Sequence, residues 1–115
     1  MNALLAAVLV LAAVPWHSSP DAAVAAARTE RKILLVHYRG SCGNCNDAAD
    51  RTMESAAADP VFQQALGSFV PLRVTAAQPE AKRYDDLFLR NRQPVLAFFT
   101  SDGLLLHWIE NPNRG

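Results

Sequence analysis

The stretch that decides the fold is ILLVHYRGSCGNC, residues 33–45, in which an apolar run leads into two cysteines separated by two residues. Residues 33–36 are apolar at every position, and a run that is apolar on both faces is typical of a central strand in a buried sheet. Arg39 and Gly40 end the run, and residues 46–58, after the cysteines, are able to form a helix. The sequence therefore predicts a strand followed by a thiol pair at the start of a helix.

Cys42 and Cys45 are the only cysteines in the chain. A disulfide between them would close a loop of two residues, and the stabilisation that a disulfide gives through chain entropy grows with loop length. The pair is therefore a poor structural cross-link, even in an oxidising compartment, and redox chemistry explains it better. A helix start lowers a thiol pKa through its free N–H groups and its dipole. We expect Cys42 to attack a partner disulfide and Cys45 to resolve the mixed disulfide.

Length and composition limit the class of protein. The chain has 115 residues, which corresponds to one domain with a single hydrophobic core. Its 11 basic residues balance its 11 acidic residues, and neither sign is clustered. Nucleic acid and anionic membrane surfaces are therefore not expected as partners.

The N-terminus carries an apolar run of Leu, Ala and Val over residues 4–14. This run is too short for a membrane-spanning helix, which needs about 20 residues, but it has the length and position of the apolar part of a secretory signal. We expect a signal peptide over residues 1–15, cleaved near Pro15 or after Ala25, and export to the bacterial periplasm or the extracellular space. An uncleaved anchor or a helix of the fold is the alternative interpretation.

The rest of the chain alternates between helix and strand signals. Ser19-Pro20 and Asp59-Pro60 each place an N-cap residue before a proline, which is a helix start. The pattern predicts helices over residues 20–29, 46–58, 60–66 and 79–90, strands over 33–38, 69–74, 94–99 and 104–109, and a turn at 101–103. This order predicts an α/β fold with a mixed central sheet of about four strands flanked by helices.

Four of these signals together resemble the thioredoxin-like superfamily. They are the strand that runs into Cys42-Gly43-Asn44-Cys45, the Asp59-Pro60-Val61-Phe62 segment with strand 69–74 after it, Pro94 directly before a strand, and the Ser101-Asp102-Gly103 turn. The chain also resembles exported thioredoxin-like proteins, and the C-terminal periplasmic domain of the bacterial thiol:disulfide interchange protein. The resemblance covers residues 16–110 and implies a thioredoxin-like domain over residues 16–115.

The resemblance implies an exported thiol:disulfide oxidoreductase whose redox group is the Cys42–Cys45 pair, with no bound cofactor and no metal. It implies a cis peptide bond before Pro94, with the backbone of Gln93 pairing with a substrate strand. The implied partners are protein or small-molecule disulfides and thiols, with a membrane electron donor as a further candidate.

Residues around the cysteines tune such a couple. Ser41, Gly43 and Asn44 carry no charge, so we expect a reductant or a moderate exchanger rather than a strong oxidant. Ser41 replaces the tryptophan usual in the family, and Val36 replaces a buried acid that helps to deprotonate the second cysteine. With Val36 there, we expect slower release of the mixed disulfide.

Two further departures concern Pro94 and the end of the chain. Gln93 precedes Pro94, where the family usually has a β-branched or small residue, and Val95 follows it. The given sequence ends at Gly115 without the family's terminal helix, so we expect either that the chain is a fragment or that one sheet face is thinly covered.

The remaining candidates have structural explanations. By strand alternation His37 points away from the face of Val36 and is expected to be structural, and Arg39 is expected to be a solvated loop residue. Trp16 is expected to be a core anchor, and packing in the core and the hairpin is expected for Phe98, Phe99, Leu106 and Trp108. Two other functions stay open: a Cu(I) or zinc carrier that uses the same cysteines, and a non-catalytic interaction module of the same fold.

Overall fold

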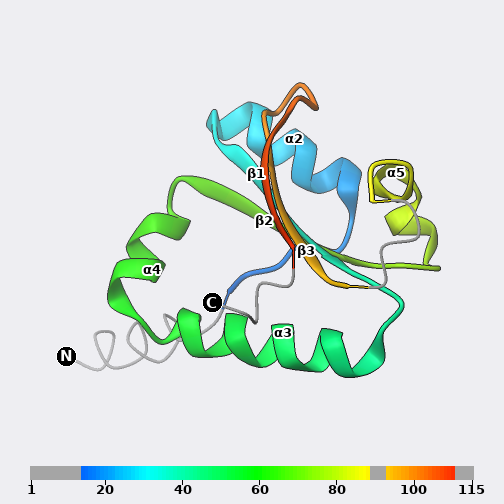
Figure 1. Cartoon of the computed structure of the whole chain (residues 1–115). Coiled ribbons are helices and arrows are strands. Elements are labelled where there is room, and N and C mark those ends of the chain that lie inside the picture. Colours follow the sequence, from blue (N-terminus) through cyan, green and yellow to red (C-terminus); the bar gives the residue numbers. More distant parts are fainter. Residues whose placement is uncertain (1–13, 89–92, 111–115) are drawn as a thin grey trace.

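The computed structural model describes residues 14–88 and 93–110 (Figure 1). Most of the predicted signal peptide, residues 1–13, therefore lies outside the described residues. The elements in chain order are α2 (Pro20–Glu30), β1 (Ile33–Arg39), α3 (Gly43–Ala57), α4 (Pro60–Leu66), β2 (Phe69–Thr75), the 3₁₀ helix η1 (Pro79–Ala81), α5 (Lys82–Asp85), β3 (Val95–Phe99) and β4 (Leu105–Glu110). Within these ranges, each helix is too short or too polar to cross a membrane.

The strands form one mixed sheet in the order β2-β1-β3-β4. β1 pairs in parallel with β2 and antiparallel with β3, and β4 pairs antiparallel with β3. In Figure 1, α3 and α4 lie on one side of the sheet and α2 and α5 lie on the other. This is the mixed four-stranded α/β architecture that the sequence predicts.

β1 contributes to both layers of the core because it is apolar on both faces. Leu34, Val36 and Tyr38 point into the layer between the sheet and α2, which also holds Ala23 and Ala27. On the opposite face, Leu35 packs with residues of α3 and α4. That second layer consists of Leu35, Met53, Leu66 and Leu96, with Val14, Trp16, Phe62, Phe69 and Phe98 against it.

The two predicted N-caps are confirmed. The Ser19 hydroxyl accepts a hydrogen bond from the backbone N–H of Ala22 at 3.3 Å, and the Asp59 carboxylate accepts one from Val61 at 2.8 Å. Each cap satisfies an N–H group that has no partner inside its helix. α2 and α4 consequently begin at the proline that follows each cap.

The predicted helix over residues 79–90 is much shorter in the structure, and its last two residues lie outside the described part. A 3₁₀ turn leads into α5, which ends at Asp85. Two acidic residues, Asp85 and Asp86, lie at its C-terminal end, where the helix dipole disfavours negative charge. Tyr84 and Phe88 are buried, but Leu87 is 53% exposed.

Leu106 and Trp108 lie in the expected β3–β4 hairpin but not in the core. Their exposed fractions are 50% and 48%, because they lie on β4, which pairs on one side only among the described strands. Phe99 is buried and Phe98 is half-buried, as expected for the adjacent inner strand.

Candidate functional site: a helix-start disulfide above a buried charge cluster

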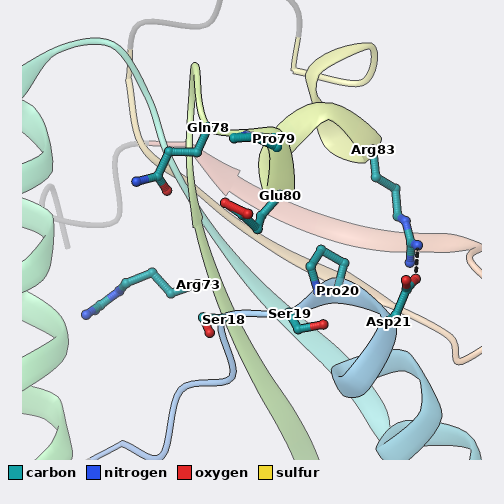
Figure 2. A pocket seen from close by; sticks show the side chains of 9 residues that line it. All are labelled: Ser18, Ser19, Pro20, Asp21, Arg73, Gln78, Pro79, Glu80 and Arg83. Atoms are coloured by element: carbon teal, nitrogen blue, oxygen red, sulfur yellow. Dashed lines mark hydrogen bonds and ion pairs between the residues drawn. The ribbon is translucent and has the colours of Figure 1, made fainter.

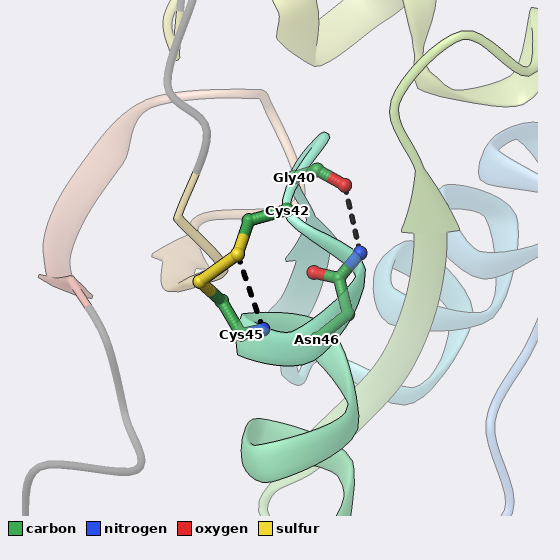
Figure 3. Close-up of a disulfide and its surroundings, with 4 residues drawn as sticks. All are labelled: Gly40, Cys42, Cys45 and Asn46. Atoms are coloured by element: carbon green, nitrogen blue, oxygen red, sulfur yellow. Dashed lines mark hydrogen bonds between the residues drawn. A yellow bond between two sulfur atoms is a disulfide. The ribbon is translucent and has the colours of Figure 1, made fainter.

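Cys42 and Cys45 are joined by a disulfide, and their Cα atoms are 5.2 Å apart (Figure 3). Both residues are partly exposed. α3 begins at Gly43, three residues earlier than predicted, and Cys42 is its N-cap. The Cys42 sulfur accepts a hydrogen bond from the backbone N–H of Cys45 at 3.2 Å. The attacking sulfur of the predicted mechanism is therefore the group that caps the helix, where a thiolate is stabilised.

The predicted tuning residues surround the disulfide at the surface. Ser41, Gly43 and Asn44 are all exposed. A Cβ atom added to Gly43 would have no atom within 4 Å. Among the described residues, the helix start is therefore open to solvent at Gly43.

Pro94 lies at the same end of the sheet as the cysteines. The β1–β3 register pairs Tyr38 with Val95, so Pro94 is level with the end of β1, from which the chain continues to Cys42. Figures 1 and 3 both show the start of β3 beside the N-terminal end of α3. The structure thus brings Gln93 and Pro94 to the thiol end of the sheet.

The expected cis bond before Pro94 is not found. The described residues contain no cis peptide bond, so the bond from Gln93 to Pro94 is trans. Trans is the lower-energy form of an X–Pro bond by about 0.5–1 kcal/mol, and the extended backbone entering β3 accommodates it. Pro94 itself is fully buried.

A partly buried ion pair fastens α3 to β1 behind the disulfide. Arg39 donates from Nε to one carboxylate oxygen of Asp50 at 3.3 Å and from Nη2 to the other at 2.9 Å. A third hydrogen bond runs from Nη1 to the Thr75 hydroxyl at 3.1 Å. The expectation that Arg39 is a solvated loop residue is therefore wrong: it ends β1, and its charge is bound by the helix that carries the cysteines.

Arg73 of β2 extends this cluster beneath α3. Its Nη2 atom is 3.8 Å from an Asp50 oxygen, and its guanidinium carbon lies 4.5 Å from the centre of the Trp16 ring. Its Nε donates to Nδ1 of His37 at 3.0 Å. Four segments of the chain, around residues 16, 37, 50 and 73, therefore meet in one polar layer.

His37 is completely buried in this layer, against the Trp16 ring. Burial, and then the positive charge of Arg73, lowers its pKa from 6.5 to about 4. Because Nδ1 accepts the bond from Arg73, the neutral ring carries its proton on Nε2, which has no hydrogen-bond partner within residues 14–88 and 93–110. His37 is therefore a neutral structural residue, as the strand alternation indicates.

Asn46 ties the helix start to the loop before it. Its side-chain amide donates to the carbonyl of Gly40 at 2.7 Å, and the residue is 6% exposed (Figure 3). Its Oδ1 atom is buried without a hydrogen-bond partner. Sequence analysis missed Asn46, Asp50 and Arg73, although an arginine inside the apolar strand FVPLRVT is a signal that a buried counter-charge is needed.

A cavity of about 770 Å³ lies apart from the disulfide (Figure 2). It lies where the start of α2, the end of β2 and the start of η1 meet, and its wall includes the exposed ion pair of Arg83 with Asp21. In Figure 2, Arg73 points away from the other lining residues toward α3. Over the ranges 14–88 and 93–110, no three His, Cys, Asp or Glu side chains gather as a metal site.

Comparison with known proteins supports the fold. No family model matches the sequence, and no curated protein matches it. Among solved structures, the chain is similar to the solution structure of a thioredoxin from Thermus thermophilus, with a TM-score of 0.59 and 18% identity. The match covers 81% of this chain and 68% of that one. Together with the strand order and the helix-start disulfide, this likeness shows that the chain has the thioredoxin-like fold.

Proposed function

We propose that this protein is a thiol:disulfide oxidoreductase that acts on the disulfides of proteins or small molecules. The observation that carries the proposal is the disulfide between Cys42 and Cys45 at the exposed N-terminus of α3. A redox-active pair needs one sulfur stabilised as a thiolate and a second sulfur within bonding distance. The capping position of Cys42 and its bond to Cys45 supply both.

The reaction starts from the reduced protein. The Cys42 thiolate attacks one sulfur of a substrate disulfide, so that a mixed disulfide forms and one substrate thiolate leaves. Cys45 then loses its proton and attacks the Cys42 sulfur, which releases the second substrate thiol. Two electrons have passed to the substrate, and the protein is left with the Cys42–Cys45 disulfide. An external thiol or a membrane dithiol donor must reduce this disulfide before the next cycle.

The surroundings of the sulfurs support a reductant or a moderate exchanger. Gly43 and Asn44 place no positive charge between the cysteines to stabilise the thiolate. Val36, at the position of the family's buried acid, is fully buried among apolar residues. Deprotonation of Cys45 then has no help from a carboxylate there, and we expect resolution of the mixed disulfide to be slow.

Reduction of insulin disulfides with an excess of small dithiol tests this function. The wild-type protein should accelerate precipitation of the insulin chains, and Cys42→Ser should remove the acceleration. In a separate reaction without dithiol, pre-reduced Cys45→Ser should retain the first attack and accumulate a mixed disulfide that mass spectrometry detects. Absence of both acceleration and mixed disulfide would contradict the proposal and favour the metal carrier or the non-catalytic module. Retention of stoichiometric Cu(I) or zinc after dialysis would distinguish between these two.

We further propose export, with cleavage of the signal peptide close to Pro15. His17 forms a parallel β-bridge with Leu72, and Ala23 is fully buried in the core. Cleavage after Ala25 would remove both residues and half of α2, so the earlier site preserves the fold. Mass spectrometry of protein recovered from the periplasm tests this: a mature N-terminus between residues 13 and 16 is expected, and uncleaved protein in the cytoplasm would contradict it.

A further inference from the structure

We propose that the charge cluster of Arg39, Asp50 and Arg73 sets the redox equilibrium of the Cys42–Cys45 couple. The cluster holds α3 on the sheet and leaves one guanidinium beneath the helix without a full counter-charge. This inference rests on the proposed thiol chemistry and specifies how that chemistry is tuned. In the reaction, Asp50 and Arg39 are positioning residues, and Arg73 supplies the electrostatic effect.

The hydrogen bonds show which guanidinium is left over. Both carboxylate oxygens of Asp50 are bound by Arg39, at 3.3 and 2.9 Å. Arg73 reaches Asp50 only at 3.8 Å, and its closer neighbours, the His37 imidazole and the Trp16 ring, are neutral. Two positive charges therefore share one carboxylate, which leaves an excess of one positive charge in this layer.

The excess charge is partly shielded from water. The Arg73 side chain is 26% exposed, and its Nη2 atom is buried with no hydrogen-bond partner among the described residues. Burial lowers the pKa of Arg73, and the carboxylates of Asp50 and Glu54 oppose that shift. Glu54 is exposed, so solvent screens its contribution. The opposing charges that face Arg73 thus compensate it only in part.

The helix connects this charge to the sulfurs. Asp50 lies eight residues after Cys42, the N-cap of α3, which corresponds to about 12 Å along the helix axis. At such distances a partly buried charge changes a thiol pKa by about 0.5–1 unit. A positive charge favours the thiolate, and so favours the reduced form over the disulfide. The couple should consequently be less reducing than its uncharged Gly43-Asn44 segment predicts.

Two variants of the cluster should change the couple in opposite directions. Arg73→Met removes the excess charge, so the Cys42 pKa should rise by about 0.5–1 unit, and the equilibrium with glutathione should move three- to tenfold toward the disulfide. Asp50→Asn removes the shared carboxylate, so the pKa should fall and the equilibrium should move toward the dithiol by a similar factor. If the cluster only stabilised the fold, the two variants would not shift the Cys42 pKa in opposite directions.

Two matched variants complete the experiment. Arg73→Lys keeps the positive charge. Its Cys42 pKa and its equilibrium with glutathione should therefore be close to those of the wild type, unlike those of Arg73→Met. Arg51→Met removes an exposed positive charge from the same helix and should change the Cys42 pKa by less than about 0.2 unit, because water screens it. The thiol pKa is read from the ultraviolet absorbance of the thiolate against pH in the reduced proteins, with circular dichroism to confirm folding.

The outcomes separate this inference from the proposed function. Shifts of the same sign in Arg73→Met and Asp50→Asn, or no shift in either, would overturn the inference while leaving the oxidoreductase intact. The thiol pKa requires no turnover, so it tests the cluster even if the wild type fails to reduce insulin. Failure of Arg73→Lys to restore the pKa would show that the Arg73–His37 hydrogen bond, and not the charge, is responsible, and would also overturn the inference.

Discussion

The Nε atom of Arg73 donates a hydrogen bond to Nδ1 of His37 at 3.0 Å, across two parallel strands whose register places the two residues side by side. The bond occupies the only lone pair of the neutral imidazole. His37 therefore cannot accept a proton without losing Arg73 and placing a second positive charge beside it. This explains why its pKa is lowered to about 4 by burial and by the neighbouring guanidinium.

Acidification should destabilise the protein through His37. In the unfolded chain the residue takes up a proton near pH 6.5, whereas in the folded protein it does so only near pH 4. Its contribution to stability is thus fully present above about pH 6.5, falls as the pH is lowered, and is lost below about pH 4. The total loss should approach about 3 kcal/mol. Urea denaturation at a series of pH values between these limits measures it.

His37→Phe provides the control for this pH dependence. Phenylalanine can fill the same buried space against Trp16 and does not titrate. The variant should lose most of the change in unfolding free energy between pH 6.5 and pH 4. An unchanged pH dependence would show that other groups, such as the carboxylates, are responsible.

The hydrogen bond between the Tyr38 hydroxyl and the Asp85 carboxylate links β1 to α5. Burial and this bond raise the pKa of Tyr38 well above its usual range. Tyr38→Phe should cost about 1.5–3 kcal/mol, as is usual for a hydrogen bond to a charged group. A double-mutant cycle with Asp85→Asn, followed by chemical denaturation, measures the coupling, and additive effects of the two changes would contradict this assignment.

The elements that could be predicted from sequence are those whose signals are local. Ser19-Pro20 and Asp59-Pro60 mark helix starts because an N-cap and a proline act within one turn. The run 33–36 identifies the central strand because it must be apolar on both faces. The Cys42–Cys45 spacing and Pro94 were identified in the same way, by short patterns next to predicted elements.

The features that sequence analysis missed depend on contacts between distant segments. Arg39 and Asp50 are eleven residues apart along the chain and meet only because α3 folds back over β1. His37 and Arg73 meet through the register of a parallel pair, which local patterns do not give. Trp108 is apolar and is expected to pack in the core and the hairpin, but its position on β4 leaves it half exposed. The exposure of an apolar strand residue depends on the position of its strand in the sheet.

Replacing Asn46 by aspartate should destabilise the helix start. The Asn46 amide donates to the Gly40 carbonyl at 2.7 Å, and a carboxylate would place a negative charge against that oxygen in a buried position. Asn46→Asp should cost about 2–3 kcal/mol at neutral pH. The introduced carboxyl should have a raised pKa, so stability should return as the pH falls and the group becomes a donor. Denaturation midpoints at neutral and acidic pH measure the effect.

Asn44→Asp is the matched control for this prediction. Asn44 is exposed two residues earlier in the same helix, so a carboxylate there stays hydrated. Its effect on unfolding free energy should stay within about 0.5 kcal/mol. Equal losses in the two variants would show that negative charge near the disulfide, rather than the Asn46–Gly40 bond, determines stability.

Two glycines of the chain should respond to alanine in opposite directions. Gly43 begins α3, and a Cβ atom there meets nothing within 4 Å, so Gly43→Ala should stabilise the fold by about 0.4–1 kcal/mol by restricting the unfolded chain. Gly103 has a φ of 95° in the β3–β4 turn, a conformation that strains residues with a Cβ atom. Gly103→Ala should therefore cost about 1 kcal/mol or more. Because alanine adds no charge beside Cys42, Gly43→Ala should leave the glutathione equilibrium unchanged. Thermal denaturation of both variants tests the stability changes, and the glutathione equilibrium of Gly43→Ala tests the redox expectation. A destabilised Gly43→Ala would contradict the open space observed at the helix start.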